Sequence, residues 1–476
     1  MTLTDPDNAV PLVERLDPAL DAVEVFRRLA GLPHVVFFDS AMRHPQLGRY
    51  SFVAADPVEW LSVAADGSDA LRRLAGRLVE LPSSTQSDLP PFQGGWAGLF
   101  GYELARSLEE VPAAAIDEFQ LPALAVGLYD VVVAFDRERK AAWLISQGFS
   151  ETDGPARRER AAARMALFRE RLKGKSSPIA DNGPRDSRAL PAAALAPQFA
   201  VAGQAELTSN FSAEAYRQAV RRAIDYIYAG DVFQVNLSQR LLHPARASSV
   251  DLYCRLRERN PAPFAGYLDG GDWQIASASP ERFLRVDDGH VETRPIKGTR
   301  GRSWRPEADL FAGDELRASE KDRAENVMIV DLLRNDLSRS CRSESVCVSQ
   351  LCGLETYQYV QHLVSVVEGT LREGSTPIDL LRTSFPGGSV TGAPKIRAME
   401  IIAELEPTVR GAYCGSLGYL GVDGQMDSSI LIRTVTAARG WWQLPVGGGI
   451  VAQSNPADEF EETWHKAAGM LRALEA

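Results

Sequence analysis

The sequence predicts an α+β protein, because candidate strands and helices follow one another in uneven order. Runs rich in β-branched and aromatic residues recur along the chain, and capped or amphipathic helical stretches lie between them without regular alternation. We find no repeat of fixed period. The 476 residues are enough for two or three ordinary domains, or for one large domain with a sizeable core.

The composition restricts the classes of partner. With 52 basic and 63 acidic residues the formal net charge is -11, so a nucleic-acid partner is not suggested, although arginines gathered locally could bind a small anion. The first ten residues lack a basic targeting region, and no apolar run approaches the roughly 18 residues of a membrane helix. We expect a cytoplasmic enzyme without a membrane partner. Five cysteines without a CxxC pair favour reduced thiols, with a zinc site at Cys341, Cys347 and Cys352 as the alternative.

Three parts are expected along the chain. Residues 1–173 form an N-terminal part with mixed strands and helices. Between 174 and 205 the composition shifts to Ser, Pro, Ala and Asp, which is typical of a flexible connector. Residues 206–476 form a C-terminal part that carries most of the chemical motifs.

In the N-terminal part, strands are expected at Val35–Ser40 and Gly48–Pro57. The glycine-rich and aromatic stretch Gln93–Ala105 is typical of a tight packing corner. Leu124–Asp136 leads through a charged turn into a further apolar run, which predicts a hairpin. Arg157–Leu172 predicts a charged amphipathic helix over the core.

In the C-terminal part, Ser212 predicts a helix N-cap and Gly230 the end of that helix. The strand expected next, Val232–Gln239, alternates apolar residues with amides and a serine. It either separates the core from a cavity or is an ordinary half-exposed strand. Further strands are expected in QIASASPERFLRV, HVETRPIKGT, LGYLG and WWQLPV, and helices at Asp322–Asn335, Pro394–Glu404 and Pro456–Leu474.

The stretch ETRPIKGTRGR places Lys297 among several arginines. A lysine is a nucleophile only when its amine is neutral, and burial or neighbouring positive charge favours that form by lowering its pKa. Pro295 stiffens the approach, and Gly298 lets the backbone come close to a ligand. The competing interpretation is a surface turn with solvated basic residues.

The loop SFPGGSVTGAPK leads into an apolar-periodic helix, for which Pro394 suits the first position. Its backbone amides, the helix dipole and Lys395 could bind an anion, a carboxylate by preference. The alternative is a connector before a well-capped helix. The loop is not a P-loop, because Ala393 stands where the lysine should be. GGGIVA at Gly447–Ala452 is not a dinucleotide-binding turn, because the next helix cannot start before Pro456.

Two acidic pairs each have a spacing of three residues: Asp322 with Glu325, and Glu459 with Glu462. On helices this spacing places each pair on one face, where like charges are unfavourable unless a cation joins them. An oxygen-only set suits Mg²⁺. The alternative is two solvated acidic faces.

Two further residues stand out. His362 lies among apolar and amide residues, where a satisfied structural histidine is the usual outcome. Arg433 lies on what the pattern predicts to be an apolar strand, where a charge is unfavourable unless it meets an anion.

Taken together, the motifs resemble the chorismate-utilising enzymes. They are SASPERF, ETRPIKGTRGR, SEKDRAENVMIVDLLRNDL, QHLVS, SFPGGSVTGAPKIRAMEII, GAYCGSLGYLG, SSILIRT and NPADEFEETWHKA. The resemblance runs from about Ser212 to the carboxyl end and is weaker before it. It implies a large two-sheet core with helices packed outside, chorismate as substrate, and Mg²⁺ as cofactor.

The resemblance also implies a role for each matching position. Glu325 and Glu462 hold Mg²⁺, with Asp322 and Glu459 close by. Lys297 is the nucleophile, and Glu281 handles the departing C4 hydroxyl. The substrate is contacted by His362, Thr391, Tyr413, Arg433, Gly448, Gly449 and Lys466.

Within the family, the lysine of PIKGT resembles the aminodeoxychorismate synthase branch, which adds ammonia to chorismate for p-aminobenzoate and folate synthesis. Anthranilate, isochorismate and salicylate synthases usually carry alanine there. Ammonia is expected from a glutaminase in a separate chain, because Cys414 is followed by a strand and not by the helix of a nucleophile elbow. No lyase domain is expected after the last motif. The alternatives are anthranilate synthase component I and a catalytically silent ligand-binding relative.

The N-terminal runs FFDS and GRYSF resemble, more loosely, the tryptophan feedback pocket of anthranilate synthases. Ser40 and the backbone near Tyr50 are expected to keep a pocket of that shape. We expect a structural remnant and not a regulator, because FFDS departs from the usual LLES.

Overall fold

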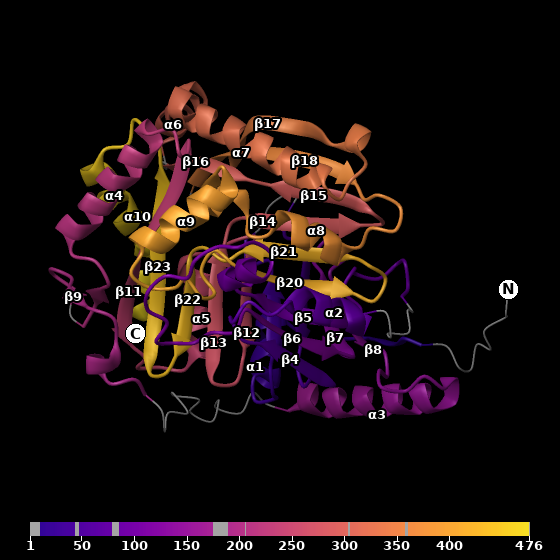
Figure 1. The fold of residues 1–476 in the computed structure, drawn as a ribbon. Helices are drawn as coiled ribbons and strands as arrows, with labels where there is room; N and C mark the ends of the chain where they lie inside the picture. The colour runs from indigo at the N-terminus through magenta and orange to yellow at the C-terminus, as the bar shows by residue number, and fades with distance from the viewer. Residues whose placement is uncertain are drawn as a thin grey trace.

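Two large antiparallel sheets form the centre of the molecule, and helices pack outside them (Figure 1). The computed structural model describes residues 10–42, 47–78, 85–174, 189–204, 206–302, 305–357 and 360–475. The α+β class and the two-sheet core expected from the sequence are confirmed.

The first sheet joins segments from both ends of the chain. Its 13 strands are β1 (Leu12–Arg15), β2 (Val36–Asp39), β3 (Tyr50–Ala54), β7 (Val131–Asp136), β8 (Ala141–Ser146), β9 (Phe199–Ala200), β10 (Thr208–Ser209), β11 (Gln234–Pro244), β12 (Phe264–Asp269), β13 (Trp273–Ser279), β19 (Gly392–Ala393), β22 (Thr434–Ala438) and β23 (Trp441–Ile450). Their order is β1-β8-β7-β3-β2-β12-β13-β22-β23-β11-β10-β9, with β19 beside β11.

The second sheet also joins strands from the N-terminal and the C-terminal parts of the chain. Its 10 strands are β4 (Glu59–Val63), β5 (Gly95–Phe100), β6 (Leu124–Tyr129), β14 (Arg282–Asp287), β15 (His290–Arg294), β16 (Ile296–Gly301), β17 (Cys347–Thr356), β18 (Val360–Thr370), β20 (Ser416–Gly421) and β21 (Met426–Ile430). Their order is β16-β18-β15-β14-β21-β20-β5-β6-β4, with β17 beside β18.

The helices cover the outer faces of the two sheets (Figure 1). They are α1 (Ala22–Leu29), α2 (Ala70–Leu78), α3 (Gly154–Lys173), α4 (Ala213–Tyr228), α5 (Ser249–Arg259), α6 (Pro306–Ala318), α7 (Glu320–Ser338), α8 (Pro377–Ser384), α9 (Lys395–Leu405) and α10 (Pro456–Leu474). Short 3₁₀ turns are η2 (Tyr102–Ser107), η3 (Ala192–Ala194), η4 (Ser343–Ser345) and η5 (Gly388–Val390).

The hydrophobic core lies in three layers. One layer packs α1, α3, α5 and α10 against the first sheet, and another packs α2, α7 and α8 against the second. Between the sheets, Phe52 of β3 and Leu99 of β5 belong to a third buried cluster with Leu417 of β20. The result is a helix–sheet–sheet–helix stack, in which each sheet buries both faces.

The N-terminal elements confirm the expected strands, hairpin and helix, with two differences. β7 and β8 pair across the charged turn, as predicted. However, the run Leu124–Asp136 is divided at Asp130, so that β6 lies in the second sheet and β7 in the first. The expected packing corner at Gln93–Ala105 is a central strand, β5, which pairs with β20 and β6.

Two of the C-terminal helices, α4 and α10, begin at the residues predicted from the sequence. The Ser212 side chain accepts a hydrogen bond from the amide of Ala215 at the start of α4, and Gly230 follows the C-cap with a φ of 84°. α10 begins at Pro456, which confirms that no helix starts directly after the triple glycine. Pro394 is the N-cap of α9 and not its first residue.

The three-part division of the chain stays a prediction. Nearly half of the expected connector, residues 175–188 and 205, lies outside the described residues. Its described part contacts the C-terminal part, since the Trp441 indole donates to the Leu190 carbonyl. No helix within the described ranges is long and apolar enough to cross a membrane.

Candidate active site

A cavity of about 710 Å³ opens where the first sheet, the second sheet and two helices meet. Its walls come from β11 and β23 of the first sheet, β16 and β18 of the second, α7, α10 and the turn η5. Asn236 and Ser238 of β11 face it, while Val235 of the same strand is fully buried. The strand therefore forms a wall of the cavity, although its apolar face is not uniformly core, since Leu237 also lines the cavity and Phe233 is 73% exposed.

Most of the candidate site residues line this one cavity, although they are spread over 186 positions of the chain, from Glu281 to Lys466 (466 minus 281, both included). They are Glu281, Lys297, Asp322, Glu325, His362, Tyr413, Arg433, Gly448, Gly449, Glu462 and Lys466. Thr391 and Glu459 are not on the wall. Thr391 is fully buried and donates to the Gly387 carbonyl over 3.1 Å, so it supports the turn from behind.

Lys297 is partly buried on β16, and its amine donates to the Ser389 carbonyl over 3.3 Å. Burial lowers the pKa of this amine, and the positive charge of Lys466 acts in the same direction, against the raising effect of Glu325 and Glu281. The net pKa lies below the usual value. Burial therefore shifts this amine toward the neutral form that a nucleophile needs.

Glu281 lies between β13 and β14 and is 4% exposed. Its Oε1 accepts a hydrogen bond of 2.5 Å from the Ser389 hydroxyl. Burial raises the pKa of Glu281 to about 7, although the Ser389 hydrogen bond and Lys297 both lower it. A carboxyl group with a pKa near neutrality can give up a proton at physiological pH, which suits a general acid.

The acidic pairs of α7 and α10 approach the cavity from two sides. Glu325 and Glu462 lie on the cavity wall. Glu459 lies just behind, and its Oε1 accepts a hydrogen bond of 2.6 Å from the Ser454 hydroxyl. Both acids lie beside Gly448 of β23, where a Cβ atom would be in ordinary van der Waals contact with them, 3.4 Å from Glu459 Oε2 and 3.5 Å from Glu462 Oε1.

Lysines balance part of this negative charge. Lys466 Nζ lies 2.6 Å from Glu462 Oε1, and Lys321 Nζ lies 3.6 Å from Glu459 Oε1. Burial raises the pKa of Glu325 and of Glu459, and carboxylates of the cluster add to both shifts. Although burial also opposes the charge of Glu462, Lys466 keeps the pKa of that carboxyl below its usual range.

The donor set fits Mg²⁺ better than zinc. No group of three or more His, Cys, Asp or Glu side chains in the described ranges is placed to hold a metal, which disfavours the alternative at Cys341, Cys347 and Cys352. Mg²⁺ usually takes only one or two carboxylates and leaves the other positions to water and substrate. Glu325 and Glu462 on the cavity wall meet that requirement.

His362 is buried on β18, with its Nδ1 2.9 Å from the Thr299 hydroxyl. Burial lowers the pKa of His362 to about 4, and Arg433 acts in the same direction. The imidazole is therefore neutral at physiological pH. It can accept or donate a hydrogen bond in the cavity without adding a charge.

We expect His362 to make the protein less stable in mild acid. Because its folded pKa of about 4 lies below the value of 6.5 for a free histidine, its contribution is complete above pH 6.5 and is lost as the pH falls toward 4. The loss approaches about 3 kcal/mol in the free energy of unfolding. Urea unfolding between pH 8 and pH 4.5 should show a smaller acid loss for His362→Asn than for the wild type. Parallel curves would contradict this assignment.

Arg433 lies between β21 and β22 and not on a continuous strand, which corrects the expectation from the sequence. Its φ of 54° marks the bend at which the chain passes from the second sheet to the first. Within the described residues no carboxylate lies at ion-pairing distance from its guanidinium, which lines the cavity. A guanidinium placed in this way fits a bound carboxylate.

Lys395, expected to assist anion binding by the glycine loop, points elsewhere. Its Nζ lies 2.7 Å from Asp336 Oδ2 and donates to the Ser384 carbonyl over 2.7 Å. Lys395 therefore ties α9 to α7 and is absent from the cavity wall. The cavity wall instead carries Lys466 and Arg433, together with Arg300, Lys321 and Arg410.

Two residues of the wall, Ser389 and Arg410, were missed by the sequence reasoning, whereas Asn236 lies on the amide face that was predicted to border a cavity. Ser389 contacts both Glu281 and Lys297, and Asn236 donates to the Ser389 carbonyl. Arg410 is buried against Glu406, with which it forms a 2.6 Å ion pair, and donates to the Val390 carbonyl. Ser389 lies inside a loop motif already singled out. By contrast, the partners of Arg410 could not be recognised without the fold.

A second cavity of about 490 Å³ contains the expected N-terminal pocket residues. Ser40 and Tyr50 both line it, and the Ser40 hydroxyl donates to the Tyr50 carbonyl over 2.6 Å. Arg282 and Asp427 form part of the same wall. The relation of this pocket to a tryptophan site stays a prediction.

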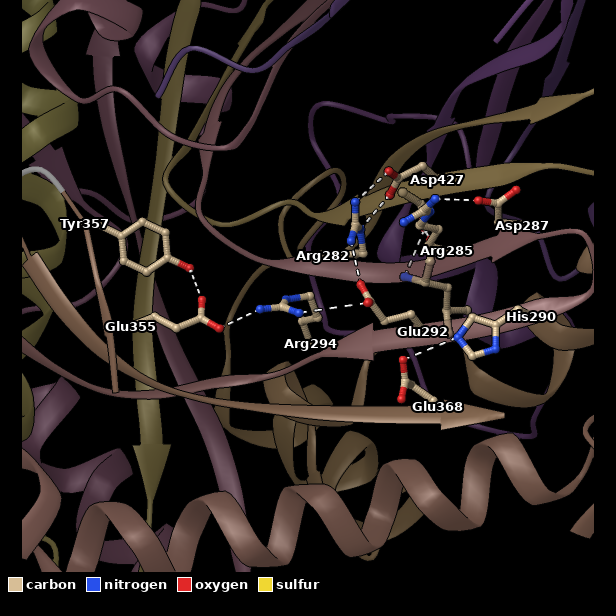
Figure 2. Close-up of polar contacts among 12 residues, drawn as sticks. Arg282, Arg285, Asp287, His290, Glu292, Arg294, Glu355, Tyr357, Glu368 and Asp427 are labelled. Atoms are coloured by element: carbon tan, nitrogen blue, oxygen red, sulfur yellow. Dashed lines mark hydrogen bonds and ion pairs between the residues drawn. The ribbon is translucent and has the colours of Figure 1, made fainter. Parts of the chain in front are cut away.

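An ion-pair ladder crosses the second sheet from this second cavity (Figure 2). The Arg282 guanidinium donates hydrogen bonds to the carboxylates of Asp427 and Glu292. The Arg294 guanidinium forms ion pairs with Glu292 and with Glu355, whose Oε1 lies 2.5 Å from Arg294 Nη2. The Tyr357 hydroxyl then donates to Glu355 over 2.8 Å. The Tyr357 ring packs edge-on against His362, with the ring centroids 5.1 Å apart. The ladder thus ends beside the first cavity.

Comparison with known proteins agrees with the fold. A family profile described as chorismate binding enzyme matches residues 42–472. Anthranilate synthase component 1 of Thermus thermophilus is 45% identical, covering 86% of this chain and 83% of the relative. Aminodeoxychorismate synthase component 1 of Salmonella typhimurium is 39% identical over 98% of each chain. The crystal structure of anthranilate synthase component I from Streptococcus pneumoniae matches with a TM-score of 0.76 and 32% identity, over 90% of this chain and 93% of that one. The chain belongs to the chorismate-binding enzyme family.

Proposed function

We propose that the chain is component I of an aminodeoxychorismate synthase in the cytoplasm, which converts chorismate and ammonia to 4-amino-4-deoxychorismate for p-aminobenzoate and folate synthesis. The observation that carries this proposal is Lys297, whose amine lies in the cavity with a lowered pKa. A second lysine, Lys466, and the guanidinium of Arg433 line the same cavity and suit the two carboxylates of chorismate.

In the first step, the neutral Lys297 amine attacks C2 of the substrate ring. Both ring double bonds move by one position toward C4, the bond from C4 to its hydroxyl oxygen breaks, and Glu281 protonates that oxygen so that water leaves. Hydroxide is a poor leaving group, so the acid is required as the bond breaks. The raised pKa of Glu281 supports this role.

In the second step, ammonia adds at C4 and the bond between C2 and the lysine nitrogen breaks. Both double bonds return to their first positions and the Lys297 amine is released. The proton that ammonia loses restores Glu281, so chorismate and ammonia yield the amino product and one water. Two easier displacements replace one difficult one.

Mg²⁺ would be held by Glu325 and Glu462, with Asp322 and Glu459 close by. When bound, the ion would neutralise the ring carboxylate of chorismate and orient the substrate. Support comes from the oxygen-only donor set on the cavity wall and from the close approach of α10 to β23 at Gly448.

Ammonia is proposed to come from a glutaminase in a separate chain. Within this chain, Cys414 is a poor candidate for the glutaminase nucleophile. Burial raises the pKa of its thiol to about 12, whereas such a nucleophile must be a thiolate. The strand β20 follows it, in place of the helix of a nucleophile elbow.

Anthranilate synthase component I is the second candidate. The relative from Thermus thermophilus, which bears that name, is 45% identical, against 39% for the aminodeoxychorismate synthase relative. The two activities differ in the carbon that receives ammonia and in the elimination of pyruvate. Overall identity does not distinguish them, whereas a lysine at position 297 favours the first.

The product distinguishes the two candidates. With chorismate, Mg²⁺ and an ammonium salt, we expect chorismate to be consumed without anthranilate, and p-aminobenzoate to form only when an aminodeoxychorismate lyase is added. Reactions without Mg²⁺ and without ammonium serve as controls. Anthranilate formed directly, without an added lyase, would reject the proposed function.

A further inference from the structure

Among the described residues, Ser389 is the only one that hydrogen-bonds to both proposed reacting groups, the Glu281 acid and the Lys297 amine. Its hydroxyl donates to Glu281 Oε1 over 2.5 Å. Its carbonyl accepts from Lys297 Nζ over 3.3 Å. The two groups come from the junction of β13 with β14 and from β16, so one residue of η5 bridges two separate segments.

The turn that carries Ser389 is held rigidly. The Asn236 amide donates to the Ser389 carbonyl over 3.3 Å, and the Arg410 guanidinium donates to the neighbouring Val390 carbonyl over 3.0 Å. Arg410 is itself fixed by Glu406 in a buried ion pair. Packing is close as well, since a Cβ atom on Gly388 would lie 2.5 Å from a methyl carbon of Leu332. The position of Ser389 is therefore imposed by the surrounding structure.

The two oxygens of Glu281 have different surroundings. Oε1 accepts the Ser389 hydroxyl, whereas among the described residues no hydrogen bond reaches Oε2. Glu281 lies on the cavity wall, so the second oxygen is the one left for a substrate. The titratable neighbours of this carboxyl group are Lys297 on β16 and Cys414 before β20.

We infer that Ser389 is a positioning residue with two roles. It directs the proton of Glu281 to the oxygen that faces the substrate, and it fixes the position of this acid relative to the Lys297 amine. An oxygen that accepts a hydrogen bond is the less basic of the two, so the proton lies on Oε2. From there it reaches the departing C4 hydroxyl oxygen as that bond breaks. The inference rests on the proposed function only for the role of Lys297, because proton delivery to a leaving hydroxyl does not depend on which product forms.

The test compares Ser389→Ala with Ser389→Thr, which keeps the hydroxyl. Chorismate consumption is followed against pH at saturating Mg²⁺ and constant free ammonia. The Ser389 hydrogen bond lowers the pKa of Glu281, which is about 7, so its loss raises that pKa. For Ser389→Ala we expect the inflection near pH 7 to move upward by about one unit and kcat to fall about 10- to 100-fold. KM for chorismate should change less than about threefold, because the substrate carboxylates are bound elsewhere.

The control variants separate positioning from packing. Ser389→Thr should keep the wild-type inflection. Ser389→Gly also lacks the hydroxyl and should show the upward shift of the inflection, so it provides the test if the alanine variant folds poorly. An unchanged inflection in the alanine and glycine variants, or the same upward shift in the threonine variant, would overturn the inference. Since substrate consumption is measured, a wild type that forms anthranilate would reject the proposed function and leave this test intact.

Discussion

Wild-type protein incubated with chorismate and Mg²⁺, without ammonia, is expected to gain the mass of chorismate less one water, and Lys297→Ala is expected to gain nothing. The attacking amine forms the adduct, and without ammonia the second displacement cannot release it. Intact-mass spectrometry reads both results, and peptide mapping should place the modification on Lys297. With ammonia supplied, turnover of Lys297→Ala should fall by at least about 10³-fold, because a covalent nucleophile cannot be replaced by water or solvent.

The matched control for the adduct is an exposed lysine. Lys140 lies in the turn between β7 and β8 with a φ of 48°, which asparagine tolerates, so Lys140→Asn should fold normally and keep the adduct. An adduct that maps to another residue, or one that persists in Lys297→Ala, would remove Lys297 from the mechanism. The role of Glu281 as the acid would then have to be tested by itself.

Arg294→Met is expected to lower the free energy of unfolding by about 3–5 kcal/mol, because it leaves the buried carboxylate of Glu355 without its cationic partner. The Arg294 and Glu355 side chains are only 9% and 8% exposed, and Glu292 is 17% exposed. These carboxylates form the middle of the ion-pair ladder (Figure 2). Urea unfolding monitored by tryptophan fluorescence measures the loss.

Two comparisons show whether the effect comes from an unpaired charge. Arg294→Met combined with Glu355→Gln should recover part of the loss, because the second substitution removes the charge left without its partner. Arg317→Ala breaks an exposed pair with Asp314, with exposures of 61% and 73%, and should change stability by less than about 1 kcal/mol. Equal losses for Arg294→Met and Arg317→Ala would contradict the account.

Local signals predicted five of the ten helices in the described residues, α3, α4, α7, α9 and α10, because caps and apolar periods involve residues close together in the chain. Ser212 accepts a hydrogen bond from an amide in the first turn of α4, and Asn455, which the sequence analysis did not single out, does the same at the start of α10. The acidic spacing in α7 and α10 likewise predicted that each pair lies on one helix face, since a helix repeats every three to four residues. These helices were therefore placed to within a few residues.

Features that depend on residues distant in the chain could not be predicted from the sequence. Gly95 and Gly98 read as a corner, but their φ values of 134° and 152° belong to a central strand. There a Cβ atom would lie 2.3 Å from the Leu420 carbonyl oxygen or 2.2 Å from that of Ala125. Lys395 illustrates the same limit, because its partner Asp336 is 59 residues away in the sequence.

The candidate site shows both situations. Glu281, Lys297, Glu325 and Glu462 were recognised because each lies in a motif with chemistry of its own. Their meeting in one cavity follows from the sheet order, which no local pattern contains. Ser389 was overlooked because a serine in a glycine-rich turn usually serves the turn itself.

The order of strands in the first sheet has a consequence for how the protein is made. β22 and β23 are translated after more than 430 residues, yet they lie between β13 and β11 near the middle of that sheet. A growing chain therefore presents unpaired strand edges on both sides of a gap until its last segments emerge from the ribosome. Such an intermediate is prone to aggregation. The yield of folded protein in cells should therefore depend on chaperones and on temperature more than on the stability of the finished protein.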